Sequence, residues 1–417
     1  MNYTAINNVL GIICEYNPFH NGHLSHIEKS KKLTNATHTI VLMSGNFTQR
    51  SEPAIIDKWS RAEMAILNGV DLVIELPNIF ATASAEDFAY GAIKIFKELK
   101  IVSKLSFGSE CGDIKKLENL ADLFLIQPEE FMYHLENALS TGISYPSALS
   151  KATDLTLKSK VYSSILNNPN NVLGIEYIKQ IKQQNFPVTA ITIQRTEPHN
   201  TDDNSTISNI SSGSRIRKAI IQNEEFKQSV PQNVYNILLN NLKYITTSSL
   251  KPFEDILFYN ILTMSLDELA NIQDVSEGLE NRIKKAAFIS KNYEELVSNI
   301  KSKRYTKSKV RRILLNILLK TTKKDMHTAK SMKPYIRVLG FNNKGKDLIK
   351  LIAENNPKLD IIVSVSSFEK ENTNKSKSKI FNKDILSTDL YSLSTTPYLP
   401  IKLDYTQKVV YVNNDKN

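Results

Sequence analysis

The sequence contains little cysteine and no long apolar segment, and each absence excludes a class of protein. Only two cysteines, Cys14 and Cys111, occur among 417 residues. Two thiols cannot form a disulfide framework or complete a zinc site alone, so a reducing compartment is the default. No stretch of about 18 apolar residues is present, which argues against a membrane span. Residues 1–8 lack the basic start and apolar core of a signal peptide. We therefore predict a cytoplasmic protein that does not enter a membrane.

Acidic residues are scarce in one segment of an otherwise ordinary soluble composition. Between residues 301 and 350 there are 16 lysines and arginines against two acidic residues, whereas the whole chain carries a formal net charge of +10. A local basic region predicts a polyanionic partner, here a nucleic acid; the alternative is a solvated helix face. Tyr305 is expected to stack on a base while its neighbours follow a phosphate backbone. These neighbours are Arg304, Lys307, Lys309, Arg311 and Arg312.

Strand-like and helix-like stretches alternate in the first half of the chain. Apolar stretches typical of strands lie at residues 9–13, 39–43, 71–76, 104–107 and 188–193. Strands separated by helices predict βαβ units and an α/β fold with a Rossmann-like parallel sheet. Residues 114–167 are expected to form a helical insertion. The alternation stops near Val230, so we expect one domain at residues 1–229 and a mainly helical, basic region at residues 230–417, with late strands near 361–365 and 409–412.

Two histidines stand where the first strand turns into a helix. His20 and His23 are three residues apart, which places them on one face of a helix, and Gly22 lets the backbone approach a ligand. Unpaired N–H groups at a helix start bind phosphate, and imidazoles there can donate hydrogen bonds as charge develops. We therefore predict a triphosphate site with His20 and His23 as catalytic residues. The alternatives are two surface histidines or a metal-binding pair, with Glu15 or His26 as third ligand.

The residues around this pair match a known family. The string Glu15-Tyr16-Asn17-Pro18-Phe19-His20-Asn21-Gly22-His23 contains the H-x-G-H signature of the nucleotidylyltransferase superfamily. The full string resembles the bacterial tRNA(Met) cytidine acetate ligase family. Further matches lie at residues 43–50, 52–54, 57–62, 107–110, 169–177, 305–315 and 335–342.

The resemblance implies a two-step activity. ATP and acetate would form acetyl-adenylate and pyrophosphate, and the acetyl group would pass to N4 of the wobble cytidine in elongator tRNA(Met). Residues 1–229 would then be a nucleotidylyltransferase-like, ATP-binding catalytic domain, and residues 230–417 would bind tRNA. Mg²⁺ is expected with ATP, held mainly by phosphates and water; the sequence does not identify its protein ligands. The alternatives are a small-molecule adenylyltransferase of the same superfamily and a non-catalytic RNA-binding protein.

The resemblance also implies a set of ATP-binding residues. Gly108 would end a strand where a side chain would collide with the nucleotide, or is an ordinary turn glycine. Asn171 would read the ribose or adenine, or caps the next helix. Arg195 would hold the α-phosphate or adenine region, or is a surface charge. The remaining contacts run along the first loop and helix: Ile13, Cys14, Glu15, Tyr16, Asn17, Pro18, Phe19, His20, Asn21, Gly22, His23, Leu24, Ser25 and His26.

A second phosphate signature is expected near the end of the first domain. Residues 210–217 are similar to that superfamily motif, so Ser214 and Arg217 are expected to contact the β- and γ-phosphates; the alternative is a serine N-cap on a basic exposed helix. Two departures from the family pattern occur. Pro198-His199-Asn200 stands where the family tends to have Tyr-His-Asp, and Ser51 stands where glycine is expected.

Overall fold

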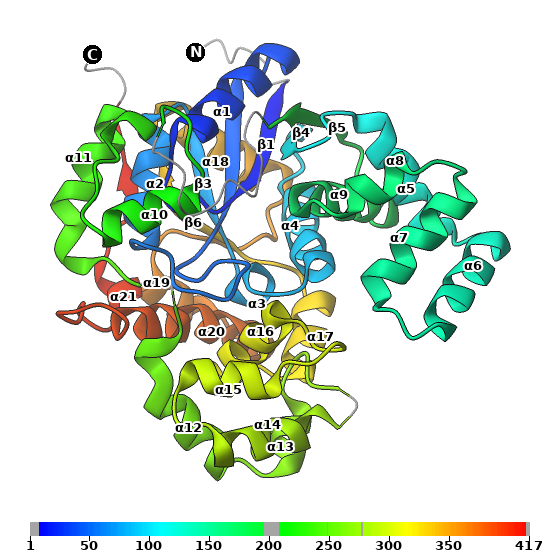
Figure 1. Cartoon of the computed structure of the whole chain (residues 1–417). Coiled ribbons are helices and arrows are strands. Elements are labelled where there is room, and N and C mark those ends of the chain that lie inside the picture. The colour runs from blue at the N-terminus through cyan, green and yellow to red at the C-terminus, as the bar shows by residue number, and fades with distance from the viewer. Residues whose placement is uncertain (1–7, 196–207, 248, 277, 414–417) are drawn as a thin grey trace.

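A computed structural model describes residues 8–195, 208–247, 249–276 and 278–413 (Figure 1). Within those residues the strands form one eight-stranded sheet in the order β5-β4-β1-β2-β3-β6-β7, with β8 paired to β6. All neighbouring strands are parallel except β3 and β6, which are antiparallel. The strands are β1 (Val9–Cys14), β2 (His38–Ser44), β3 (Leu72–Leu76), β4 (Val102–Ser109), β5 (Thr189–Gln194), β6 (Ile336–Phe341), β7 (Ile361–Ile362) and β8 (Val410–Tyr411). The chain turns back at β1, with β2 on one side and β4 on the other, which makes this junction a topological switch point.

Helices cover both faces of the sheet because alternate strand residues point to opposite sides. Leu10 and Ile12 belong to the core under one helical layer, whereas Val9 belongs to the core under the other. The first layer contains α1 (Asn21–Thr34), α2 (Lys58–Leu67), α10 (Gly213–Ile221) and α11 (Gln232–Asn241). The second contains α3 (Asn78–Ala81), α4 (Ala85–Leu99), α9 (Pro169–Gln183), α18 (Asn343–Asn355), α19 (Val365–Glu371) and α20 (Lys375–Ser392). The short helix α21 (Leu403–Thr406) follows α20.

Two groups of helices project from this core (Figure 1). One consists of α5 (Ile114–Ile126), α6 (Glu129–Ser140), α7 (Tyr145–Thr156) and α8 (Val161–Leu166). The other, called the helical lobe below, consists of α12 (Glu254–Thr263), α13 (Leu266–Asn271), α14 (Leu279–Ile289), α15 (Tyr293–Ile300) and α16 (Lys307–Leu318), followed by α17 (Lys323–Ser331). The helical lobe has its own apolar core, and Phe47 from the β2–α2 loop lies in it. The lobe is therefore anchored to the sheet domain at that loop.

The expected fold class is confirmed, and the five N-terminal strands and the helical insertion at residues 114–167 lie where they were predicted. Strand β6 was missed, and the late strand expected at residues 361–365 ends at Ile362 as β7. The division at residues 229 and 230 stays a prediction. However, β6, β7 and β8 extend the N-terminal sheet, so the second half of the chain is not helical throughout.

The environment of the basic cluster near Tyr305 differs from the one we expected. Tyr305 is only 8% exposed, and Lys309 Nζ lies 5.3 Å from its ring centroid, so the ring is not free to stack on a base. Arg311 pairs with Glu52, and Arg312 Nε lies 2.9 Å from Asp274. These two arginines are therefore structural, and the exposed cations of this region lie earlier, in the turn before α16 and at the first residue of that helix: Lys301, Lys303, Arg304 and Lys307.

Candidate active site

A cavity of about 330 Å³ opens at the carboxyl ends of β1, β4 and β5, at the switch point of the sheet. This crevice is where open α/β sheets bind ligands. The buried Arg61 of α2 fixes its floor, because its Nη1 donates to the carbonyls of Glu15 at 2.6 Å and Ser44 at 3.1 Å. The ends of β1 and β2 are thereby held together beneath the pocket.

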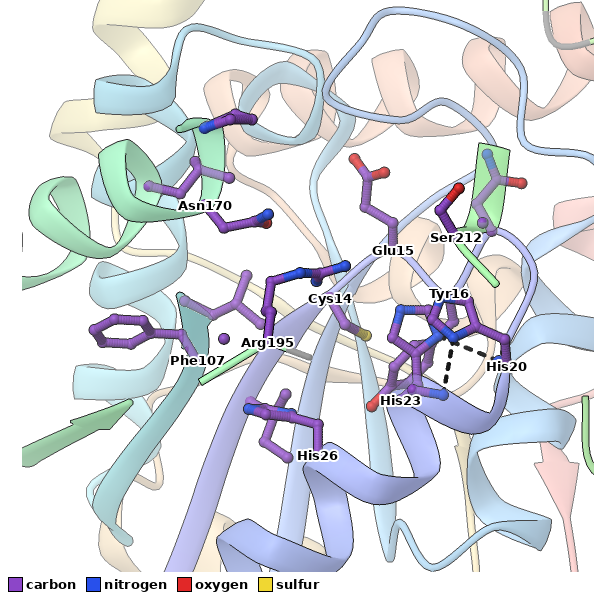
Figure 2. A pocket seen from close by; sticks show the side chains of 18 of the residues that line it. Cys14, Glu15, Tyr16, His20, His23, His26, Phe107, Asn170, Arg195 and Ser212 are labelled. Atoms are coloured by element: carbon purple, nitrogen blue, oxygen red, sulfur yellow. Dashed lines mark hydrogen bonds between the residues drawn. The ribbon is translucent and has the colours of Figure 1, made fainter. Parts of the chain in front are cut away.

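His20 and His23 form one wall of this cavity at the start of α1. His20 is the extended N-cap residue, and its Nδ1 accepts a hydrogen bond from the N–H of Gly22 at 3.1 Å. The backbone N–H of His20 donates to Nδ1 of His23 at 3.3 Å. The rings stack with centroids 3.6 Å apart, as Figure 2 shows. Because both Nδ1 atoms accept hydrogen bonds, each neutral ring carries its proton on Nε2 and can donate that N–H to a ligand.

Burial keeps these imidazoles neutral. Desolvation, followed by the charges of Arg195 and Arg217, lowers the pKa of His20 to about 3. Burial, with smaller contributions from His20 and Arg195, holds the pKa of His23 well below its usual value. Burial also lowers the pKa of His26 to about 4. At neutral pH the pocket therefore presents uncharged N–H donors, and its positive charge comes from other side chains.

The start of α10 lies against the β1–α1 loop and forms a second helix N-terminus at the pocket. Ser212 is its N-cap and accepts from the N–H of Arg215 at 3.2 Å. Arg217 Nη1 donates to the carbonyl of Asn17 at 2.7 Å. A Cβ at Gly213 would lie only 3.2 Å from that carbonyl, so glycine permits this close approach. Two helix N-termini thus converge on one cavity, an arrangement suited to an anion.

Arg195 crosses the pocket from the end of β5 (Figure 2). Its buried Nε has no hydrogen-bond partner within the described residues. A Cβ at Gly108 on β4 would lie 3.3 Å from Cγ of Arg195, so the glycine leaves room for this side chain. The lining contains four cationic residues, Lys29, Arg50, Arg195 and Arg217, against two carboxylates, Glu15 and Glu52. The site is therefore built for a polyanion.

Comparison with known proteins identifies the family of this chain. The model of the family described as HIGH Nucleotidyl Transferase matches residues 7–404. A tRNA(Met) cytidine acetate ligase from Thermoanaerobacter sp. strain X514 is 43% identical over 389 residues, which cover 93% of this chain and 95% of the relative. The protein of the same name from Acetivibrio thermocellus is 40% identical over 418 residues, covering 96% and 99%.

This chain belongs to the tRNA(Met) cytidine acetate ligase family. Solved structures agree. The apo form I of Thermotoga maritima TmcAL superposes with a TM-score of 0.89 at 31% identity, covering 98% of this chain and 100% of that one. A second structure of the same protein, described as bound with alpha-thio ATP, gives a TM-score of 0.87 at the same identity and coverage.

Most residues predicted to bind ATP line the one cavity described above. From the first loop and helix these are Ile13, Cys14, Glu15, Tyr16, Asn17, His20, Gly22, His23, Ser25 and His26, and from elsewhere Gly108, Arg195, Ser214 and Arg217. Their roles toward ATP remain predictions. The fold thus brings together in one cavity residues that are up to about 200 positions apart in the sequence.

Five of the predicted contacts do not line the cavity, namely Pro18, Phe19, Asn21, Leu24 and Asn171. Phe19 is fully buried and packs edge-on against Tyr16. Asn21 turns outward and donates to the carbonyls of Asn209 and Gln228 at 2.8 and 2.9 Å. Leu24 packs against the core beneath α1. These residues shape the loop and helix that carry the lining side chains.

Asn171 is buried and its amide makes three hydrogen bonds within the protein, so the ligand contact expected for its side chain stays a prediction. Its Oδ1 accepts from the N–H groups of Glu110 and Cys111 at 2.9 and 3.1 Å, and its Nδ2 donates to the carbonyl of Ile165 at 3.0 Å. It therefore fixes the turn after β4. Its neighbour Asn170 lines the cavity instead.

Sequence reasoning missed the pocket wall that comes from the β2–α2 loop. Thr48, Gln49, Arg50 and Glu52 line the cavity, although residues 43–50 and 52–54 were noted only as a family match. Because β1 and β2 pair in parallel, their carboxyl ends lie at the same edge of the sheet. The parallel sheet predicted from the sequence already implied that the loops after these two strands would lie close together. Further lining residues that were not assigned are Ile12, Lys29, Phe88, Phe107, Pro169, Leu173, Tyr177, Ile193, Gln194, Ile210, Ser212 and Gly213.

The two departures from the family pattern have different outcomes. Ser51 has a left-handed φ of 59°, which explains why glycine is expected there. Its Oγ lies 3.3 Å from the carbonyl of Thr82, a contact that glycine would lack. Pro198-His199-Asn200 lies outside the described residues. In the described part of the chain no group of three or more His, Cys, Asp or Glu side chains is placed to hold a metal ion.

Proposed function

We propose that this protein is an ATP-dependent ligase that activates acetate as acetyl-adenylate, with release of pyrophosphate, and then transfers the acetyl group to N4 of the wobble cytidine of elongator tRNA(Met). The observation that carries the proposal is the convergence of two helix N-termini and the Nε2–H groups of His20 and His23 on one polyanion pocket. The family named above supports it. No helix in the described ranges is long and apolar enough to cross a membrane, and ATP and tRNA suit the cytoplasmic location expected from composition.

In the first half-reaction acetate attacks the α-phosphorus and pyrophosphate leaves. The neutral imidazoles donate Nε2–H bonds to phosphate oxygens, and these bonds strengthen as negative charge grows in the transition state. The N-termini of α1 and α10, with Arg195 and Arg217, hold the triphosphate in line. No covalent protein nucleophile is required, because acetate itself attacks phosphorus.

Mg²⁺ fits this pocket as part of the nucleotide rather than as a resident ion. The two lining carboxylates each have a protein partner, since Glu15 accepts from Gln49 N–H at 2.7 Å and Glu52 accepts from Arg311. Phosphate oxygens and water would therefore supply most ligands. When bound, the ion would neutralise charge on the leaving pyrophosphate.

The decisive experiment measures both half-reactions. Acetate-dependent exchange of pyrophosphate into ATP reports the first, and nucleoside analysis of elongator tRNA(Met) reports N4-acetylcytidine from the second. A small-molecule adenylyltransferase would not show acetate-dependent exchange, and a non-catalytic RNA-binding protein would show neither signal. Either result would refute the proposal.

A salt titration tests the tRNA-binding part of the proposal. Lys303 in the turn before α16 and Lys307 at the first residue of that helix are exposed cations. If both contact phosphates, Lys303→Ala with Lys307→Ala should reduce the log–log salt slope of tRNA binding by somewhat under 2. The matched control replaces Lys358 and Lys370, which are exposed elsewhere in the chain. An unchanged slope in the first variant would place tRNA on another surface.

A further inference from the structure

The β2–α2 loop (residues 45–57) joins the pocket to the helical lobe. Phe47 lies in the core of the lobe and bridges to Pro53 across the loop. The N–H of Thr48 donates to the carbonyl of Glu52 at 3.0 Å, which closes a tight turn. The side chains of this turn form the pocket wall nearest the lobe. A substrate held by the helical lobe would reach the pocket past this wall.

Glu52 is the carboxylate at this junction. Its Oε1 accepts from Nη1 of Arg311 on α16, whereas its Oε2 has no hydrogen-bond partner among the residues that the structure describes. The side chain is 14% exposed, so it is largely shielded yet open to the cavity. Glu15, the other lining carboxylate, differs because it accepts from the N–H of Gln49 and belongs to the β1 side.

The charges that face Glu52 come from four elements. They are Arg311 on α16, Arg217 on α10, Arg50 in its own loop and Glu15 after β1, with the Tyr293 hydroxyl of α15 also near Arg311. Burial raises the pKa of Glu52, Arg311 is the largest opposing influence, and Glu15 adds a smaller upward one. A carboxylate with a raised pKa accepts a proton more readily than an exposed one.

The second half-reaction needs such a group. The N4 amine of cytidine is conjugated with the ring and is a weak nucleophile, so proton removal must accompany its attack. The N4–C bond to the acetyl carbonyl forms and the carbonyl C–O bond to AMP breaks. The electron pair of that bond leaves with the AMP phosphate. One N4 proton must be taken up, and later released to water.

On this basis we propose that Glu52 is the general base of acetyl transfer, taking the N4 proton on its free Oε2, and that Arg311 is the positioning residue that holds Glu52 at the pocket wall. The inference rests on the function proposed above and names a residue for its second step. It also explains why the helical lobe contributes a cation that pairs with a carboxylate of the pocket wall.

The test separates the two half-reactions in the full-length chain. Acetyl-adenylate is first formed on the enzyme from ATP and labelled acetate with pyrophosphatase present, and elongator tRNA(Met) is then added. Glu52→Gln should lower the single-turnover transfer rate by about 100-fold or more, the usual effect of losing a general base. Acetate-dependent ATP–pyrophosphate exchange should fall much less than the transfer rate does, because the attack of acetate on phosphorus requires no proton removal. Glu52→Asp should restore part of the transfer rate.

The pH profile of transfer supplies a readout that a merely structural role would not move. In the wild type the transfer rate should fall at low pH as Glu52 protonates, and Glu52→Gln should lack this limb. Arg311→Met removes the main influence that lowers the pKa of Glu52, so the acidic limb should move to higher pH. Arg312→Met is the matched control, because it breaks the neighbouring pair with Asp274 outside the pocket lining.

Several outcomes overturn the inference. Wild-type transfer by Glu52→Gln would do so, and so would an equal loss in both half-reactions, which would assign Glu52 to ATP binding. An acidic limb that does not move in Arg311→Met would remove the positioning role. These results differ from failure of the proposed function, in which the wild type forms acetyl-adenylate but never acetylates tRNA.

Discussion

The backbone N–H of His20 donates to the Nδ1 atom of His23, 3.3 Å away, and this bond ties the tautomer of one pocket histidine to the N-cap of α1. The same ring therefore has two separable functions. Nδ1 stabilises the helix start, and Nε2–H is left for the ligand. A substitution that preserves one function and removes the other can distinguish them.

His23→Asn should make this separation. The Asn amide can occupy the Nδ1 position and keep the bond from His20 N–H, but it has no atom at the Nε2 position. Acetate-dependent pyrophosphate exchange should fall by about 10²–10³-fold, as when one donor to a developing oxyanion is lost. His23→Ala should lose exchange equally and also about 1 kcal/mol of unfolding free energy with the cap. Wild-type exchange in both variants would refute the phosphate role.

Stability should decrease as the pH falls, because three buried imidazoles have lowered pKa values. The pKa is about 3 for His20, about 4 for His26 and well below its usual value for His23. Below about pH 6.5 the unfolded chain binds protons that the folded chain does not, so stability is present above that pH and is lost toward the folded pKa values. At pH 5 each of these histidines should lower the unfolding free energy by about 2 kcal/mol relative to neutral pH.

Urea unfolding at pH 7 and pH 5 measures this loss. The amide of His26→Gln can keep the contact with Ser106 Oγ. In this variant the loss of unfolding free energy between pH 7 and pH 5 should be smaller than in the wild type by about 2 kcal/mol, the amount expected for one histidine. The same pH difference in His26→Gln and wild type would show that His26 is not protonated on unfolding in this range.

The room left by Gly108 should matter for ATP binding through Arg195. Gly108→Val would crowd the Arg195 side chain, since even a Cβ would lie only 3.3 Å from its Cγ. One charge-assisted hydrogen bond contributes about 1.5–3 kcal/mol, so the KM for ATP should rise roughly 10- to 100-fold. Arg195→Ala should have a similar effect, and the double variant should be no worse than the single ones. Additive losses would mean that Gly108 acts independently of Arg195.

The sequence predicted the sheet and the histidine wall because both depend on local signals. Alternating strands and helices define the N-terminal half, and the position of His20 and His23 after a strand defines the helix start. That Asn170 rather than Asn171 lines the cavity was harder to predict, because both residues are asparagines and only the packing of α9 decides which side chain faces the pocket. The burial of Tyr305 in the core of the helical lobe and the pairing of Arg311 with Glu52 were also hard to predict, because tertiary packing and not the local sequence decides them.

Strand β6 was missed because its residues do not alternate between apolar and polar as those of a half-exposed strand do. Ile336 to Leu339 are all buried, including Arg337, which is 5% exposed. A charged residue in such a run argues against a central strand unless a partner is known. The partners of Arg337 are Glu75 and Asp404, which lie far from it in the sequence. These ion pairs help to join the C-terminal half of the chain to the sheet.

The buried charge cluster around Arg337 should contribute strongly to stability. Lys58 Nζ lies 2.8 Å from both Glu75 and Asp404, and Arg337 lies 3.3 Å from Glu75 and 2.6 Å from Asp404. Removing one member of a buried network leaves an uncompensated charge and costs about 3–5 kcal/mol. Lys58→Met should therefore lower the unfolding free energy by that amount in urea titrations. Lys182→Met, which breaks the partly exposed pair with Asp122, should leave the unfolding midpoint unchanged.

The same cluster tests the domain division at residues 229 and 230. A fragment of residues 1–229 would keep Lys58 and Glu75 but lose both Asp404 and Arg337. It would also expose the edge of β3 and the side chain of Phe47. We therefore expect the fragment to lack a cooperative urea transition, whereas adding residues 230–417 as a separate chain should restore one only if the two halves reassociate. A cooperative transition of the fragment alone would show that residues 1–229 fold without the C-terminal strands of the sheet.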